Sequence, residues 1–238
     1  DPLAEAGVDV LREHCSVTVK TGMTEAQLIK DIGKYHAMVV RSGTRVTADI
    51  IKAAKNMKII ARAGVGVDNI DIDAATDAGI VVINSPRGNT LSAAEHALSL
   101  MMSMVRNIPA ADRSLREGRW DRKTFVGTEL FHKTLGLLGL GKVGSVVAER
   151  AVAMGMKVIA YDPFAGEEHA TRIGVTLAGF TTVLKKADII SMHMPHTRDT
   201  HHLLGAKELR MMKKGVRIVN AARGGIIDEE ALLRALKS

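Results

Sequence analysis

Short apolar runs and longer amphipathic segments alternate along the whole chain. A run of about four apolar residues suits a buried strand, whereas a longer segment with apolar residues at helical spacing suits a helix. The first third of the chain therefore predicts βα units around a parallel sheet. Strands are expected at 16–19, 37–40, 58–61 and 80–83, and helices at 1–14, 24–33, 47–56 and 69–79. The first of these helices is expected to have Asp1 as its N-cap and Pro2 as its first helical residue, and the last is expected to end at Gly79.

The segment 84–90 breaks this rhythm with proline, glycine and polar turn residues, and it predicts the crossing between two domains. A long helix is expected at 90–108. It has more apolar positions than one amphipathic face requires, which predicts that it is covered on two sides. After an irregular basic and aromatic stretch at 115–130, a second series predicts strands at 134–138, 157–161, 187–192 and 216–221, with helices at 142–155, 180–187 and 206–214.

The whole pattern predicts an α/β fold with two flavodoxin- or Rossmann-like parallel-sheet domains, residues 1–85 and residues 86–238. Hydrophobic residues make up 46% of the chain, enough for a sizeable core. No apolar run approaches the roughly 20 residues that cross a bilayer, so we expect a cytoplasmic protein without membrane association. The single cysteine, Cys15, excludes a disulfide framework and any CxxC motif, and no metal site is expected.

A formal net charge of +7 favours anionic partners. Nucleic acid is not expected, because the few aromatic residues offer little stacking surface and the Lys and Arg residues are spread along the sequence. A small anionic substrate or a phosphate-bearing cofactor accounts for the same charge, as does a solvated surface.

Three glycines follow the apolar strand 134–138 directly and open a helix: Gly139, Gly141 and Gly144. In this context GxGxxG is a dinucleotide fingerprint, in which the glycines give a tight turn, close approach of the backbone to the pyrophosphate, and close packing of helix on strand. Asp162 ends the next strand, at the spacing expected for a carboxylate that binds the adenosine ribose. Because that carboxylate repels a 2′-phosphate, the predicted cofactor is NAD and residues 86–238 are the predicted NAD-binding domain.

Several motifs resemble those of the D-isomer-specific 2-hydroxyacid dehydrogenases, namely "GLGKVG", "YDPF", "ADIISMHMP" and above all "NAARGGIIDEEALLRAL". "RAGVGVDNIDIDAAT" and "GTELFHKTLGLLGLG" are similar to the members that oxidise D-3-phosphoglycerate to 3-phosphohydroxypyruvate in serine biosynthesis. The resemblance implies a substrate-binding domain at 1–85 and a small 2-hydroxy or 2-keto acid substrate.

The resemblance implies a role for Arg223, which would hold the carboxylate and carbonyl of the substrate beside the nicotinamide. A guanidinium suits this task because it can donate two parallel hydrogen bonds to a carboxylate. The same resemblance places the backbone N–H groups of Val65 and Gly66 at the substrate carboxylate, and Arg41, with Arg62 as a second candidate, at the phosphate. On the cofactor side it adds Lys142, Val143, Met194, Pro195, Ala221 and Ala222.

The family's catalytic histidine and the glutamate that orients it have no counterparts among these residues, and the family's first strand would precede Asp1. We therefore expect a segment that is short at both ends and that does not turn over substrate alone. His193 and His196 end a predicted strand, but His193 matches a position beside the cofactor and not the proton donor.

Two alternatives stay open. A glyoxylate or hydroxypyruvate reductase on the same scaffold would need no phosphate site at Arg41. A non-catalytic, NAD-sensing interaction protein would share the fold, although retention of Arg223 argues against it.

The family also pairs its NAD-binding domains, so we expect a homodimer that buries the methionines of the helix 90–108, with Trp120, Arg122 and Lys123 near the interface.

Overall fold

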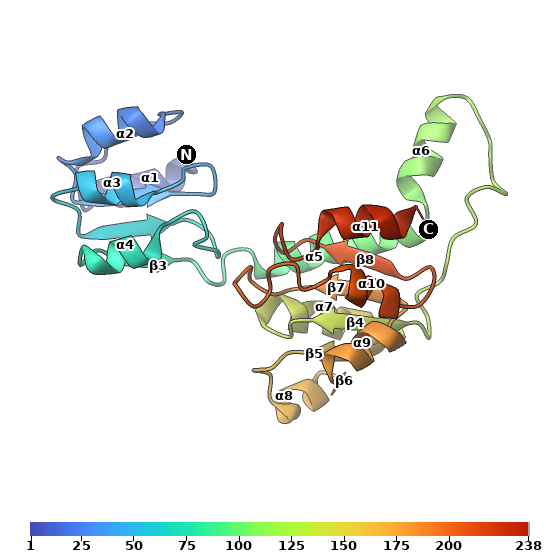
Figure 1. The fold of residues 1–238 in the computed structure, drawn as a ribbon. Coiled ribbons are helices and arrows are strands. Elements are labelled where there is room, and N and C mark those ends of the chain that lie inside the picture. Colours follow the sequence, from blue (N-terminus) through green and yellow to red (C-terminus); the bar gives the residue numbers. More distant parts are fainter. Residues whose placement is uncertain (238) are drawn as a thin grey trace. The chain divides into compact units, whose positions relative to one another are not determined.

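The computed structural model describes residues 1–237 and divides the chain into two compact units, Asp1–Asn89 and Thr90–Ser238. Both units are layers of helices on a parallel sheet, which confirms the predicted α/β fold class (Figure 1). Among the described residues no helix has both the length and the apolar character needed to cross a membrane.

The first unit has a sheet of three parallel strands in the order β1-β2-β3. Its core packs around Val40, Ile50 and Ile60, each only 1% exposed. The helix α2 begins with a capping box, in which the Thr24 hydroxyl accepts from the N–H of Gln27 while the Gln27 side chain accepts from the N–H of Thr24. The elements are α1 (Glu5–Arg12), α2 (Glu25–Ile32), β1 (Ala37–Val40), α3 (Ala48–Ala53), β2 (Ile59–Arg62), α4 (Ile72–Asp77) and β3 (Val81–Asn84).

Two expectations for the first unit are wrong. Residues 16–19 form no strand, because they pair with no other strand, and Val19 is 56% exposed. Asp1 does not cap α1, whose N-cap is Ala4. The Asp1 carboxylate instead accepts hydrogen bonds from the backbone N–H groups of Arg41 and Thr44, at 2.8 and 3.0 Å. A cavity of about 420 Å³ lies along the open edge of β1.

The second unit has five parallel strands in the order β6-β5-β4-β7-β8, with the first strand of the series, β4, in the centre. This is the doubly wound order in which the chain reverses direction beside the central strand. The strands are β4 (Thr134–Leu138), β5 (Lys157–Tyr161), β6 (Val175–Leu177), β7 (Ile189–Met192) and β8 (Arg217–Asn220).

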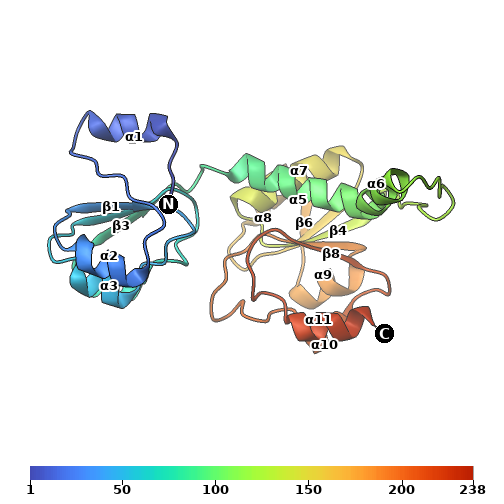
Figure 2. The same ribbon diagram turned by 90° about the horizontal axis from the view of Figure 1, so that it is seen from above.

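Helices cover both faces of this sheet (Figure 2). One face packs against α5, α7 and α8 around Met101, Leu135 and Val147, and the other packs against α9, α10 and α11 around Leu138 and Leu184. The burial of both faces explains why the strands are apolar throughout. The helices are α5 (Thr90–Val105), α6 (Ile108–Arg116), α7 (Lys142–Ala153), α8 (Glu167–Arg172), α9 (Phe180–Lys186), α10 (Ala206–Met211) and α11 (Glu229–Leu236).

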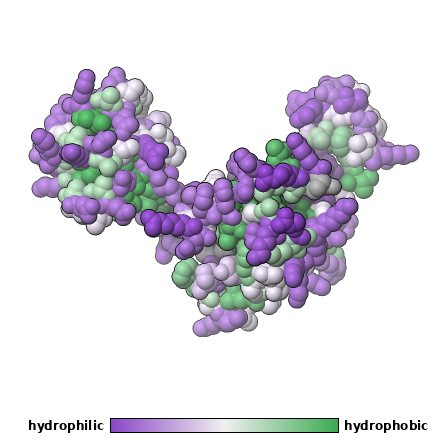
Figure 3. Space-filling model, viewed as in Figure 1, coloured by the Kyte–Doolittle hydropathy of each residue, from purple (hydrophilic) through white to green (hydrophobic). Residues whose placement is uncertain are grey.

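The long helix predicted at 90–108 ends at Val105, because Asn107 takes a left-handed conformation (φ 55°) and α6 starts directly after it with Pro109 in its first turn. The helix α6 and the segment that follows it extend away from the sheet (Figure 1). Several apolar side chains in this region are exposed, and Figure 3 shows hydrophobic surface beside α6.

Candidate active site

The turn between β4 and α7 is built on glycines that tolerate no side chain. Gly139 has φ 96°, and a Cβ there would lie 2.6 Å from the carbonyl oxygen of His193. A Cβ on Gly144 would collide with the carbonyl oxygen of Gly139, so the first turn of α7 packs directly on the end of β4. These are the two constraints that the fingerprint predicted for the first and third glycines.

Gly141 differs from the other two, because a Cβ there would meet no atom within 4 Å. It is the N-cap residue of α7, with no side-chain cap, and Lys142 and Val143 follow it in the first turn. The N-terminus of a helix offers unpaired N–H groups and a partial positive charge to an anion. The open space at Gly141 therefore suits a pyrophosphate, and the residues present fit a dinucleotide.

Asp162 follows the end of β5 and binds this turn. One carboxylate oxygen accepts from the N–H of Leu140 at 2.7 Å, and the other accepts from the N–H of Phe164 at 2.8 Å. Each carboxylate oxygen can accept more than one hydrogen bond. Asp162 can therefore support the glycine turn and still accept from the hydroxyl groups of a ribose.

Arg223 lies beyond the end of β8, in a turn that Asn220 shapes. The Asn220 side chain donates to the carbonyl of Arg223 at 2.8 Å and accepts from the N–H of Ala222 at 3.1 Å. Gly225 follows with φ 77°, a left-handed conformation that favours glycine. Arg223 is partly buried, and its guanidinium donates to the carbonyl of Ala222 at 2.8 Å.

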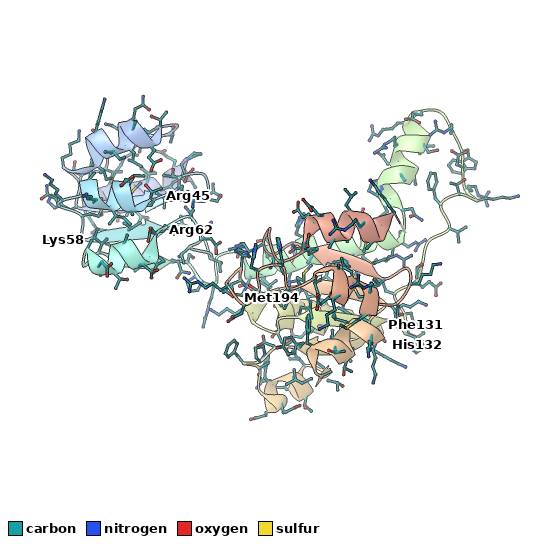
Figure 4. The ribbon with its side chains drawn as sticks, viewed as in Figure 1. Arg45, Lys58, Arg62, Phe131, His132 and Met194 are labelled. Atoms are coloured by element: carbon teal, nitrogen blue, oxygen red, sulfur yellow. The ribbon has the colours of Figure 1, made fainter. Side chains whose placement is uncertain are left out.

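The segment after β7 forms the neighbouring wall. Met194 lies two residues beyond the end of β7 (Figure 4), and Pro195 follows it. The N–H of His202 donates to the carbonyl of Gly225 at 2.8 Å, and a Cβ on Gly225 would lie 2.9 Å from Nε2 of His196. Since β4, β7 and β8 are parallel neighbours, their carboxyl ends meet at one edge of the sheet, so the structure brings together the cofactor-side residues predicted from the sequence.

His193 is held as a neutral ring. Its Nε2 forms a 2.9 Å hydrogen bond with the hydroxyl of Ser191, which is fully buried, and its backbone packs against Gly139. Desolvation by burial lowers the pKa of His193 to about 4.

In the first unit the predicted substrate residues lie at the carboxyl ends of β1 and β2. Arg41 follows β1 and is exposed, whereas Arg62 ends β2 and lies against Gly64 (Figure 4). The buried Nε of Arg62 has no hydrogen-bond partner among the described residues. Such an orphaned donor beside a glycine-rich loop suits an anionic ligand.

Val65 and Gly66 lie in the loop after β2, which two asparagines hold. Asn84, the last residue of β3, donates to the carbonyl of Val65 at 2.6 Å, and Asn69 donates to the carbonyl of Arg41 at 2.7 Å. Sequence reasoning missed Asn69, Asn84 and Asn220. Two of them are the last residues of apolar strands, which is the signal that could have identified them.

Among the described residues there is no group of three or more His, Cys, Asp or Glu side chains that could hold a metal ion. The residues predicted for the site offer guanidinium groups, backbone N–H groups and a carboxylate, which are suited to binding and orienting anions.

Residues 98–238 match the family model described as D-isomer specific 2-hydroxyacid dehydrogenase, NAD binding domain. The whole chain is 54% identical to the D-3-phosphoglycerate dehydrogenase of Archaeoglobus fulgidus and 52% identical to that of Synechocystis sp.. It covers 45% and 43% of those two proteins, so the chain spans less than half the length of these relatives.

Two solved structures of a reductase and a dehydrogenase are also similar to this chain. A glyoxylate reductase from Paecilomyes thermophila is 34% identical with a TM-score of 0.89, over 98% of this chain and 74% of that one. The D-lactate dehydrogenase of Aquifex aeolicus, solved with NAD and lactic acid, is 30% identical with a TM-score of 0.83, over 88% of this chain and 63% of that one.

Proposed function

Because this chain belongs to the D-isomer-specific 2-hydroxyacid dehydrogenase family, we propose that it serves the NAD-dependent oxidation of D-3-phosphoglycerate to 3-phosphohydroxypyruvate, in serine biosynthesis. The relatives of about 50% identity named D-3-phosphoglycerate dehydrogenase support this substrate. The structural observation that carries the proposal is Arg223, which Asn220 and Gly225 hold in a turn at the same sheet edge as the glycine turn of the cofactor site.

NAD supplies the acceptor of the hydride that leaves C2 of the substrate. The residues that would hold it are those of the glycine turn and the ends of the neighbouring strands. Gly141 and the first turn of α7 would bind the pyrophosphate, and Asp162 would bind the ribose. The full set is Gly139, Gly141, Lys142, Val143, Gly144, Asp162, Met194, Pro195, Ala221 and Ala222.

Arg223 binds and orients the substrate. A guanidinium that donates two parallel hydrogen bonds to the carboxylate and carbonyl fixes the plane of the reacting carbon, and each such charged bond is worth about 1.5–3 kcal/mol. Arg223 has no lone pair and therefore cannot accept the alcohol proton. His193 is also unsuited as the base, because its ring is bonded to Ser191 and its pKa is lowered to about 4.

The first unit offers candidate anion-binding groups of its own. The N–H groups of Val65 and Gly66 would bind the carboxylate, while Arg41 and Arg62 would bind the phosphate. The orphaned Nε of Arg62 supports the second assignment, since a buried donor without a partner gains a hydrogen bond when an anion binds.

The apolar surface around α6 supports a homodimer formed through the second unit. Trp120 is 73% exposed and Val126 is 77% exposed, and Ile108 and Leu115 on α6 are also exposed. Exposed apolar side chains gathered in one segment are typical of an interface. Arg122 and Lys123 belong to the same segment and would lie at the rim. The proposed location is the cytoplasm.

A glyoxylate or hydroxypyruvate reductase is the second candidate, favoured by the structural match to a glyoxylate reductase. The discriminating experiment measures NAD(H)-linked activity of the protein at its native length with D-3-phosphoglycerate, glyoxylate and hydroxypyruvate. We expect NADH formation with D-3-phosphoglycerate at the highest kcat/KM of the three. Faster reduction of glyoxylate or hydroxypyruvate would replace the proposal with the second candidate.

A further inference from the structure

A chain of hydrogen bonds runs from the helix α8 to the glycine turn of the cofactor site. The Arg172 guanidinium lies 3.0 Å from Nδ1 of His169, Nε2 of His169 lies 2.8 Å from the hydroxyl of Ser145, and that hydroxyl lies 3.1 Å from the carbonyl oxygen of Leu140. Ser145 is in the first turn of α7, and His169 and Ser145 are both partly buried.

The direction of each hydrogen bond follows from the chemistry of the groups. A guanidinium can only donate, so Nδ1 of His169 must accept, which requires the neutral ring with its proton on Nε2. That N–H then donates to the Ser145 oxygen, and the Ser145 hydroxyl proton donates to the carbonyl of Leu140. Each of the three contacts then pairs one donor with one acceptor, so the network specifies one tautomer and one hydroxyl rotamer.

Both backbone polar groups of Leu140 are thereby held by side chains. Its N–H donates to Asp162 at 2.7 Å, and its carbonyl accepts from Ser145. The carbonyl of Leu140 and the N–H of Gly141 belong to one peptide group, which is planar and trans. The hydrogen bond to the Leu140 carbonyl therefore fixes the direction of the Gly141 N–H. This N–H lies beside the open space at Gly141, where an added Cβ would have no atom within 4 Å.

We propose that Ser145, His169 and Arg172 are positioning residues for the dinucleotide, which orient the Leu140–Gly141 peptide so that its N–H donates to the pyrophosphate. The network reaches the cofactor through α8, a helix that the fingerprint does not include. The inference rests on the proposed position of the pyrophosphate and does not depend on the identity of the hydroxy acid.

Two amide replacements of His169 separate the proposed role from simple packing. The amide of Gln reaches about as far as Nε2 of histidine, whereas the amide of Asn reaches only about as far as Nδ1. His169→Gln can therefore keep the contact with Ser145, and His169→Asn cannot. We expect the Kd of NADH, measured by calorimetry on this chain, to rise about three- to tenfold in Ser145→Ala and in His169→Asn, because each loses the contribution of about one hydrogen bond. In His169→Gln the Kd of NADH should stay within about twofold of the value for the unsubstituted protein.

Thr171→Ala is the matched control, because Thr171 is an exposed residue of the same helix, and it should leave the Kd of NADH unchanged. Equal affinities in His169→Gln and His169→Asn, or an unchanged affinity in Ser145→Ala, would overturn the positioning role. If the unsubstituted protein bound no NADH, the proposed cofactor site would be wrong, and the positioning role proposed for Ser145, His169 and Arg172 would be wrong as well.

Nitrogen NMR of the histidine rings tests the network without any ligand. We expect the Nε2–H tautomer for His169, a mixture of tautomers in Arg172→Met, and a shifted Gly141 amide signal in Ser145→Ala with the Gly179 signal as an unmoved reference. An Nδ1–H tautomer in the unsubstituted protein would contradict the donor order.

Discussion

Arg223 is the residue on which the proposed chemistry depends most. Lysine keeps the positive charge but loses the planar pair of donors, so Arg223→Lys should lower kcat/KM for the hydroxy acid about 10- to 100-fold. The Kd of NADH should change less than threefold. Steady-state kinetics and NADH titration check both values. Arg234→Lys, an exposed position on α11, serves as control, and an equal loss in that variant would show that the effect is not specific to the site.

Asp162 should set the preference for NAD over NADP. Asp162→Asn keeps an acceptor for one of the two backbone N–H groups but removes the charge that repels a 2′-phosphate. We expect the ratio of the Kd of NADPH to the Kd of NADH to fall at least about tenfold, since a charge pair of like sign is removed. Calorimetry with both cofactors measures the ratio. An unchanged ratio would leave Asp162 with only its structural bonds to the turn.

His193 should make folding stability depend on pH. Because burial lowers its pKa to about 4, from about 6.5 in the unfolded chain, the unfolded state binds more protons between those values. Stability should be fully present above pH 6.5 and should fall by roughly 2–3 kcal/mol as the pH drops to about 4. His193→Gln, which can still bond to Ser191, should show a flatter profile in urea unfolding. A profile as steep as that of the unsubstituted protein would assign the pH dependence to other groups.

The residues that sequence reasoning identified are those with a strict local requirement. Gly139 and Gly144 were recognisable because only glycine fits their positions. The asparagines at 69, 84 and 220 and the pair of Ser145 and His169 were missed, because their contacts join residues 2 to 28 positions apart through side chains, and no periodic pattern marks such contacts.

At the level of helices and strands, apolar runs buried in the sheet were predicted well, and β4 and β5 have the expected bounds. The strand β6 and the helices α6 and α8 were not predicted, and one predicted strand, at 16–19, does not form. The strand β6 is only three residues long and lies at the sheet edge, where fewer apolar positions are required. The segment 16–19 has the composition of a strand but no partner, and composition alone cannot supply one.

The apolar residues of α6 lead to a prediction about assembly. If this surface is an interface, Leu115→Glu should convert a dimer to a monomer at micromolar concentration, because a buried unpaired carboxylate costs several kcal/mol. Sedimentation velocity measures the change. Val10→Glu on α1 is the matched control, since Leu115 and Val10 are both 57% exposed. A monomer before substitution, or dissociation by both variants, would contradict this interface.

At the scale of the whole molecule, the chain contains one unit with the glycine turn of a dinucleotide-binding domain and one unit with arginines and a glycine-rich loop at its strand ends. The glycine turn was predictable from the fingerprint, and the family match over residues 98–238 confirms the NAD-binding domain. The choice of hydroxy acid was less predictable, because it depends on Arg41 and Arg62, whose assignment to a phosphate came only from the resemblance.

The central claim is that this protein selects a phosphorylated hydroxy acid. The most direct measurement compares kcat/KM for D-3-phosphoglycerate and for D-glycerate, which differ only in the phosphate, with saturating NAD and the protein at its native length. Charge-assisted hydrogen bonds from arginine to the phosphate should give D-3-phosphoglycerate an advantage of at least about tenfold. Equal values, or a preference for D-glycerate, would contradict the proposed phosphate site and the substrate assignment built on it.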